Sequence, residues 1–174
     1  MNVTHNDFMR EVIPRYSHPM PPEPRWLDAD ERESWIGLAR LLIRLPAALD
    51  AQLRRDAGLT HFEYQVLAAL SEQDDRRLRM STLAAFADGS LSRLSQVVAR
   101  LERRGWVERS ADPDDGRYTI ASLTEAGWDT IVTAAPGHVE EVRRLVLDPL
   151  TAAQVRQLRA IAERINRTID PEPC

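Results

Sequence analysis

The sequence predicts a mainly α-helical fold with a small β wing. Apolar residues recur at spacings of three and four over residues 28–56, 90–103 and 151–169, which is typical of amphipathic helices. Gly105 ends the second of these segments, and a short strand, an acidic turn at 112–116 and a returning strand follow. A helix followed directly by a hairpin is typical of a winged helix-turn-helix domain, here with further helices at both ends.

We expect five parts along the chain. They are a proline-rich N-terminal arm (1–27), an N-terminal helix used for dimerisation (28–58), the winged helix-turn-helix domain (59–123), C-terminal dimerisation helices (124–169) and a tail (170–174). Pro46 is expected to kink the first long helix, and Pro136–Gly137 to break or bend the helix that starts after residue 124. The terminal helices have apolar stripes but no sheet to cover, which favours packing against a second copy.

Start signals place the helices in order. Serine or threonine stands before each predicted helix after the first, because its side-chain oxygen accepts a hydrogen bond from the first turn. These residues are Thr60, Ser81, Ser90, Thr124 and Thr151, and Glu63 and Gln154 complete two capping boxes. A short strand is expected near residues 78–80, and a turn at Asp88–Gly89 separates the two helices of the helix-turn-helix.

Charge is unevenly distributed over the chain. All 23 basic residues are arginine, and the net charge is −4. Residues 76–117 nevertheless carry nine arginines against six acidic residues. A locally basic module on an acidic frame is the expected pattern for a protein that binds nucleic acid through one surface.

The sequence argues against an enzyme, a metal protein or a membrane protein. No run approaches the roughly 18 apolar residues of a membrane span, and the N-terminus has no signal-peptide core. Cys174 is the single cysteine, and the four histidines are scattered without metal-site spacing. No glycine-rich phosphate loop is present. We therefore expect a cytoplasmic protein that is not an enzyme and has no cofactor and no membrane contact.

The helix that follows Ser90 carries residue types suited to reading DNA. Its predicted buried face is Leu91, Leu94, Val97, Val98 and Leu101, and its opposite face shows Ser92, Arg93, Ser95, Gln96 and Arg100. Hydroxyl, amide and guanidinium groups match the donors and acceptors of the major groove. We expect Arg93 or Arg100 to bind guanine and Gln96 to read adenine, whereas Ser90 and Ser95 suit phosphates.

The wing carries one basic tip. Arg117 is placed to enter the minor groove, and Asp115 is expected to orient Arg117 or to close the turn. Any one arginine here is better explained as a solvated surface residue. The whole arrangement is not, because the helix shows almost no carboxylate between residues 90 and 100.

Three stretches together resemble a MarR-type (multiple antibiotic resistance regulator) transcription factor. They read MSTLAAFA, SLSRLSQVVARLERRGWVER and DPDDGRYTIASLTEAG, and the resemblance covers about residues 29–169. It implies a homodimer joined by its terminal helices, with two winged domains reading a palindromic operator in double-stranded DNA, usually as a repressor. By position, Ser90, Ser92, Arg93, Ser95, Gln96 and Arg100 match the family's recognition helix, and Asp115 and Arg117 match its wing. Gly116 stands where many members have a second arginine, so the recognition helix is expected to carry more of the affinity.

The resemblance also implies DNA release by a small, commonly aromatic or phenolic effector. The implied pocket lies between the dimer helices and the DNA-binding lobe, and its candidate residues are Trp35, Arg40, Arg44, His61, Phe62 and Tyr64. A ligand wedged there is expected to change the spacing of the two recognition helices, which must fit half-sites about one helical turn apart. In the competing interpretation, Trp35 and Phe62 are core residues and His61 merely starts a helix.

The alternative function is a winged-helix protein–protein adaptor without DNA binding. Such an adaptor predicts apolar residues on the exposed helix face and no arginine at the wing tip. The sequence has the opposite pattern at both places.

Overall fold

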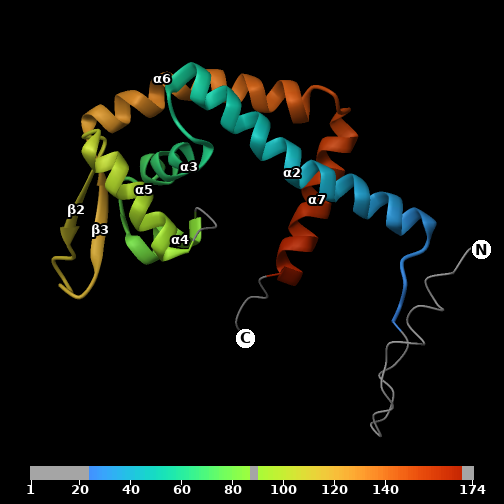
Figure 1. Ribbon diagram of the computed structural model, residues 1–174, viewed down its shortest axis with the longest axis horizontal. Helices are drawn as coiled ribbons and strands as arrows, with labels where there is room; N and C mark the ends of the chain where they lie inside the picture. Colours follow the sequence, from blue (N-terminus) through green and yellow to red (C-terminus); the bar gives the residue numbers. More distant parts are fainter. Residues whose placement is uncertain (1–23, 87–89, 170–174) are drawn as a thin grey trace, which may run out of the picture. The chain divides into compact units, whose positions relative to one another are not determined.

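The computed structural model describes residues 24–86 and 90–169. Its elements are α2 (Ala29–Ala57), α3 (His61–Ser71), β1 (Arg77–Arg79), α4 (Met80–Phe86), α5 (Leu91–Arg103), β2 (Val107–Ala111), β3 (Thr119–Leu123), α6 (Glu125–Val142), the π-helical turn η1 (Arg143–Leu147) and α7 (Ala152–Ile169) (Figure 1). The chain forms two compact units, residues 1–37 and 38–174, with the boundary inside α2. The part boundaries predicted at residues 58 and 123 stay predictions. The predicted arm up to residue 23, the Asp88–Gly89 turn and the tail from residue 170 lie outside the described residues.

The described part of the first unit is a non-helical segment that leads into α2. Asp28 and Glu31 form a capping box at the helix start. The Glu31 backbone amide donates to Asp28 Oδ1 at 2.8 Å, and the Asp28 amide donates to Glu31 Oε2 at 3.0 Å. This reciprocal pair satisfies two donors that the first helical turn leaves open.

The second unit contains the predicted winged helix-turn-helix domain. Its core is built from side chains of α2, α3, α4, α5, α6, the sheet and the link between α2 and α3. The largest fully buried ones are Leu53, Leu59, Leu67, Leu70, Leu83, Leu94 and Leu101. Apart from Leu59, which lies between α2 and α3, these leucines come from the apolar stripes that the sequence pattern predicts. The mainly helical class with a small β wing is therefore confirmed.

The wing is a three-stranded antiparallel sheet of order β1-β3-β2. The central strand β3 pairs with β1, where Arg79 lies opposite Ile120, and with β2, where Val107 lies opposite Leu123. The strand predicted near residues 78–80 is therefore confirmed as Arg77–Arg79, a third strand of the wing sheet.

Most of the predicted helix starts are confirmed. The hydroxyls of Thr60, Ser90, Thr124 and Thr151 each accept a hydrogen bond from the backbone amide three residues later. The exception is Ser81, because α4 begins at Met80 and Ser81 lies inside its first turn. Gly105 follows α5 with φ +73°, the left-handed conformation that ends the helix there.

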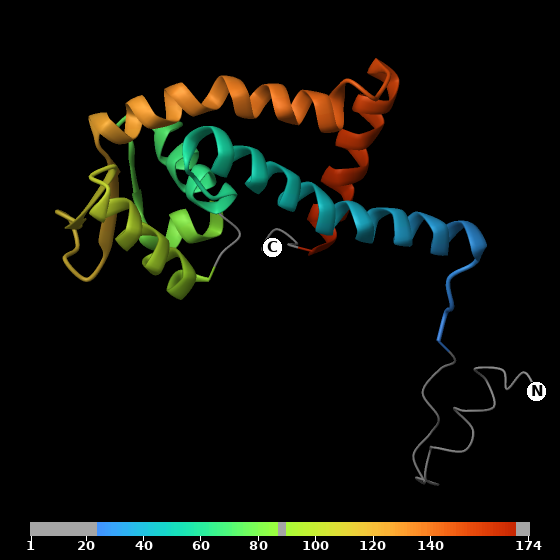
Figure 2. The same cartoon turned by 45° about the horizontal axis from the view of Figure 1, so that its top comes forward.

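Neither internal proline ends its helix. α2 runs without interruption from Ala29 to Ala57 through Pro46, and α6 continues through Pro136 to Val142. Proline removes one backbone donor, but the surrounding hydrogen bonds keep the helix continuous. The helix does not break at Pro136–Gly137, and the irregular turn comes later, at η1. The alternative of a bend at Pro136–Gly137 and the kink at Pro46 stay predictions. Figure 2 shows α6 starting where the wing sheet ends.

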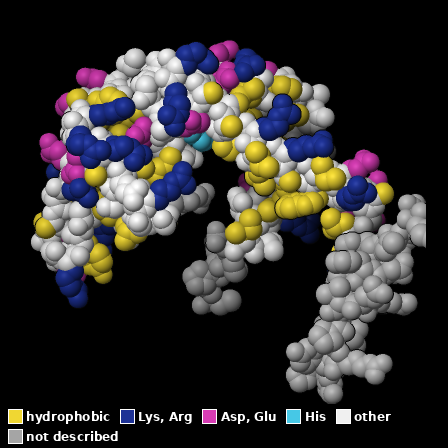
Figure 3. All heavy atoms as spheres, viewed as in Figure 1, with side chains coloured by type: hydrophobic (Ala, Val, Ile, Leu, Met, Phe, Trp, Pro, Cys, Tyr) yellow, Lys and Arg dark blue, Asp and Glu magenta, His cyan; other side chains and the backbone are white. Residues whose placement is uncertain are grey.

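α7 leaves its apolar stripe exposed in the single chain. None of its residues is buried, and Leu158, Ile161, Ile165 and Ile169 are between 38% and 67% exposed. Hydrophobic side chains are visible along this helix in Figure 3. None of the described helices combines the length and the apolar character needed to span a membrane.

Candidate nucleic-acid interface

The recognition face is the exposed side of α5. The helix buries Leu94, Val97, Val98 and Leu101 against the core and leaves Ser92, Arg93, Gln96 and Arg100 exposed, with Ser95 half-buried. Leu91 was expected in the core but is 55% exposed. It lies in the first turn, beyond the core, beside the groove between α5 and the wing. Ser90 caps the helix by accepting from the Arg93 amide at 3.2 Å.

Both arginines expected to bind guanine make contacts with α3. The guanidinium carbon of Arg93 lies 4.2 Å from the centroid of the Phe62 ring. Arg100 Nε donates to Glu63 Oε1 at 3.2 Å. The recognition face is therefore held against α3 at two points. The sequence analysis predicted neither contact.

Glu63 is buried, and its two carboxylate oxygens accept hydrogen bonds from two different groups. Its Oε2 accepts from the Thr60 backbone amide at 2.9 Å, which closes the capping box, while Oε1 accepts from Arg100. Burial alone would raise the pKa of Glu63. The hydrogen bonds from Thr60 and Arg100 outweigh burial, so the pKa of Glu63 lies below its usual value. Glu63 therefore remains charged at neutral pH and holds Arg100 in place.

At the wing tip, Asp115 contacts Arg117 and closes the turn, as the sequence suggested. Arg117 forms a two-point ion pair with Asp115, in which Nε donates to Oδ1 at 2.9 Å and Nη2 donates to Oδ2 at 2.6 Å. The Asp115 carbonyl also accepts from the Tyr118 amide at 3.0 Å, so Asp115 both orients Arg117 and closes the turn. The Arg117 side chain remains 84% exposed and extends from the wing.

The turn end of the wing is fixed by a pair that sequence reasoning missed. Arg79 of β1 donates through Nε to Oδ2 of the buried Asp112 at 2.7 Å, and its guanidinium lies 4.8 Å from the Tyr118 ring centroid. A groove of about 360 Å³ opens between Arg79 and α5, and Ser95, Arg109 and Arg117 also line it. The structure thus brings Ser95 and Arg117 together at one groove. No local sequence signal links Arg79 to Asp112, because the two residues are 33 positions apart.

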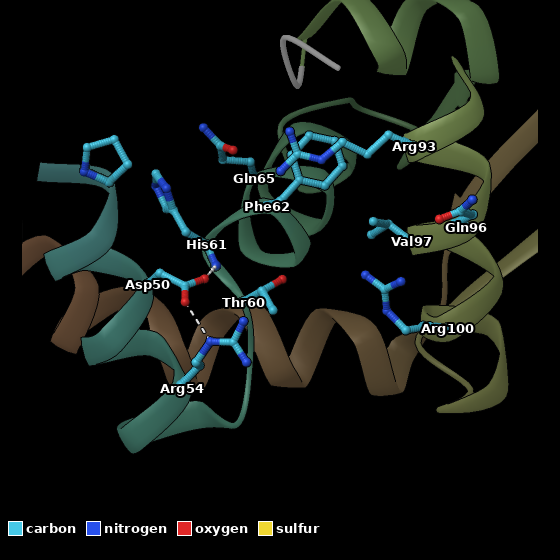
Figure 4. Close-up of a pocket in the computed structure, with 11 residues that line it drawn as sticks. Asp50, Arg54, Thr60, His61, Phe62, Gln65, Arg93, Gln96, Val97 and Arg100 are labelled. Carbon is cyan, nitrogen blue, oxygen red and sulfur yellow. Dashed lines mark hydrogen bonds and ion pairs between the residues drawn. The ribbon is translucent and has the colours of Figure 1, made fainter. Parts of the chain in front are cut away.

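A second hollow, of about 600 Å³, lies between α5 and the α2–α3 corner, and we call it the α3–α5 cavity. It is lined by Pro46, Asp50, Arg54, Thr60, His61, Phe62, Gln65, Arg93, Gln96, Val97 and Arg100 (Figure 4). It therefore brings together His61 and Phe62, predicted for an effector, and Arg93, Gln96 and Arg100, predicted for DNA. Arg54 and Gln65 were not predicted for either task.

The other predicted effector residues do not line this cavity. Arg40 and Arg44 are exposed on α2, and Trp35 belongs to the first unit. The Tyr64 ring contacts His138 of α6, with 4.2 Å between ring centroids. Tyr64 is thus part of a separate contact between α3 and α6.

His61 and His138 approach each other between α3 and α6. Their ring centroids are 5.7 Å apart, and His138 Nδ1 lies 3.2 Å from Gln52 Oε1. Burial lowers the pKa of both histidines, and the neighbouring His61 lowers the pKa of His138 further. Both rings are therefore neutral at neutral pH. Among the described residues, no three His, Cys, Asp or Glu side chains gather to hold a metal ion.

The chain is similar in sequence and fold to known DNA-binding regulators. The sequence model of the MarR family matches residues 57–117. The crystal structure of Sco3205, a MarR family transcriptional regulator from Streptomyces coelicolor in complex with DNA, is 42% identical, with a TM-score of 0.83 over 87% of this chain and 95% of that chain. The repressor IacR of Pseudomonas putida is 26% identical over 159 residues, or 89% of each protein. The regulator YdcH of Bacillus subtilis is 32% identical over 80 residues, a match that spans 45% of this chain and 54% of YdcH.

Proposed function

Because this chain belongs to the MarR family of DNA-binding transcriptional regulators, we propose that it acts as a homodimeric repressor that reads a palindromic operator and is released by a small ligand. One observation carries the proposal. The exposed face of α5 bears hydroxyl, amide and guanidinium groups, and the wing beside it ends in an exposed arginine. Two basic elements on one side suit a duplex, in which the helix enters the major groove and the wing reaches the backbone or minor groove.

The residues divide into base readers and phosphate contacts. Gln96 reads adenine, and Arg93 or Arg100 binds guanine in two-point geometry. Ser90, Ser92 and Ser95 and the amides at the start of α5 hold phosphates and fix the register. Arg117 enters the minor groove, with Asp115 fixing its direction.

A second copy supplies the other half-site. The exposed apolar stripe of α7 supports an interface between two chains, because a stripe of this kind is stable only when it is covered. A two-fold dimer presents its α5 helices to two half-sites related by the same symmetry. The similarity to the repressor IacR supports repression as the sign of regulation.

Selection from a random pool of duplexes tests the proposal. We expect a palindromic consensus, and an affinity for the selected duplex that falls steeply with salt as counterions are released. A consensus without two-fold symmetry would contradict the dimeric reading. Absence of duplex binding at low salt would refute the regulator and favour the adaptor alternative.

A further inference from the structure

Leu91 is an exposed apolar residue in the first turn of the recognition helix α5. The other leucines and valines of this helix are between 0% and 3% exposed, whereas Leu91 is 55% exposed. It shares the first turn with Ser92 and Arg93, which are also exposed. A single exposed leucine is ordinary on a protein surface, so the surroundings of Leu91 decide what it does.

Leu91 lines the groove of about 360 Å³ between α5 and the wing. Ser95 lies one turn further along the same side of the helix, because residues four positions apart lie above one another, and it lines the same groove. Met80 of α4 and Tyr118 of the wing add apolar surface to the groove. The groove therefore has an apolar wall at the start of α5, and the first residues of a recognition helix are those that contact base edges.

The same groove is also basic. Three arginines line it, each paired with a carboxylate, and the pairs are Arg79–Asp112, Arg109–Glu102 and Arg117–Asp115. In each pair the arginine side chain is more exposed than its carboxylate. The guanidinium groups therefore remain accessible to phosphates, which accept charge-assisted hydrogen bonds from them. This charge favours DNA over an apolar peptide as the occupant of the groove.

Thymine is the base that presents an apolar group in the major groove. Its C5-methyl group projects there beside the O4 acceptor, whereas the other three bases are distinguished by their hydrogen-bonding groups. A leucine covers a methyl group but satisfies no donor or acceptor. Over another base it would exclude water from polar groups without replacing their hydrogen bonds. A leucine that faces the major groove therefore favours thymine.

We propose that Leu91 reads one thymine in each half-site by covering the C5-methyl group of that base in the major groove. The inference rests on the proposed function, since it concerns how the dimer recognises its operator. It adds an apolar contact to the hydrogen bonds that Arg93 and Gln96 are proposed to make. Burial of a group of methyl size contributes about fourfold in affinity for one half-site, and about fifteenfold when both half-sites contribute.

Replacement of thymidine by deoxyuridine tests the methyl contact. It removes the methyl group and keeps every hydrogen-bonding group of the base. The probe is the duplex selected from the random pool, in which each thymine of one half-site is replaced in turn together with its symmetry mate. Dissociation constants of the full chain are measured by fluorescence anisotropy at one salt concentration, because salt alone changes the affinity. We expect one position at which the replacement weakens binding by about fifteenfold.

Leu91→Ala and Phe86→Ala form a matched pair of variants. Phe86, at the end of α4, is 59% exposed and thus resembles Leu91 in exposure, but of the two it is Leu91 that lines the groove. In Leu91→Ala the replacement at the sensitive position is expected to change the dissociation constant by less than about twofold, because the side chain that covers the methyl group is absent. Phe86→Ala is expected to keep the full effect.

The measured quantity is the ratio of two dissociation constants for the same variant. A general loss of affinity or stability therefore does not change it. An effect of deoxyuridine on the shape of the duplex is present in the parent and in both variants, so the comparison between them removes it.

Three results overturn the proposal. The first is a half-site without thymine, or one in which deoxyuridine weakens binding at no position. The second is the full deoxyuridine effect in Leu91→Ala, which would assign the methyl group to another side chain. The third is an equal loss of the effect in Leu91→Ala and Phe86→Ala, which would show that the contact does not depend on the groove. Absence of duplex binding by the parent would refute the proposed function, and this inference with it.

Discussion

Gly127, in the first turn of α6, lies where the helix meets the start of the wing. A Cβ atom at this position would lie 2.1 Å from the Trp106 carbonyl oxygen and 2.7 Å from Leu123 Cδ1. The Trp106 carbonyl also accepts from the Thr124 amide at 3.1 Å, and the Thr124 hydroxyl donates to the Gly105 carbonyl at 2.7 Å. Gly127→Ala therefore forces α6 and the wing apart at their joint.

The cost of Gly127→Ala can be worked out from these contacts. Overpacking against backbone costs about 3 kcal/mol, the upper end of the usual range, because a carbonyl cannot rotate away. Loss of the two hydrogen bonds adds about 2 kcal/mol, and the better helix propensity of alanine returns about 1 kcal/mol. The net loss of about 4 kcal/mol lowers Tm by about 8–16 °C in a chain of this length.

Differential scanning calorimetry at fixed protomer concentration measures this loss. Gly137→Ala is the control, because it lies in the same helix and its added Cβ meets only Gln52 Nε2 at an ordinary 3.7 Å. We expect the Tm of Gly137→Ala to stay level or to rise slightly through helix propensity. A Tm for Gly127→Ala within about 2 °C of the parent, less than 1 kcal/mol in a chain of this length, would refute the reasoning.

Three further predictions concern the dimer, the wing and acid stability. Leu158→Asp places a charge in the exposed apolar stripe of α7 and is expected to dissociate the dimer, so a dimer mass in light scattering would show that the interface lies elsewhere. Arg117→Ala is expected to leave Tm unchanged but to weaken DNA binding and reduce its salt slope by about one, and an unaltered slope would count against the wing contact. Burial lowers the pKa of His61 and His138 below 6.5. Below pH 6.5 the histidines of the unfolded chain therefore take up protons more readily than those of the folded chain. The free energy of unfolding is undiminished above pH 6.5 and falls as the pH drops below it. Urea denaturation at pH 7.5 and 5.5 checks this, with a smaller loss expected in His138→Gln, and equal losses in variant and parent would contradict it.

The sequence predicted those features that depend on residues close together in the chain. A capping residue and its partner lie three positions apart, so the starts of α3, α5, α6 and α7 could be read directly. Helix periodicity likewise predicted most of the core. Leu91 was misjudged because periodicity gives the direction of a side chain but not where the core ends.

The contacts that shape the site could not be predicted in the same way. Arg100 and Glu63 are 37 positions apart, and the stack of Arg93 on Phe62 also joins α5 to α3. Both depend on how the two helices pack, which the pattern of neither helix contains. The sequence analysis therefore assigned effector binding and DNA binding to different residues. The fold places residues of both predicted sets around the α3–α5 cavity.

These long-range contacts also distinguish the two arginines expected to bind guanine. Moving Arg100, whose side chain is 44% exposed, away from the buried Glu63 carboxylate would break a charge-assisted hydrogen bond worth about 1.5–3 kcal/mol. Lifting Arg93 from Phe62 gives up only a cation–π contact at an exposed site, about 0.5–1 kcal/mol, or roughly two- to fivefold in affinity. The energetic difference favours Arg93 as the side chain that moves to a base edge and Arg100 as one that stays on α3 and contacts a phosphate with its remaining donors.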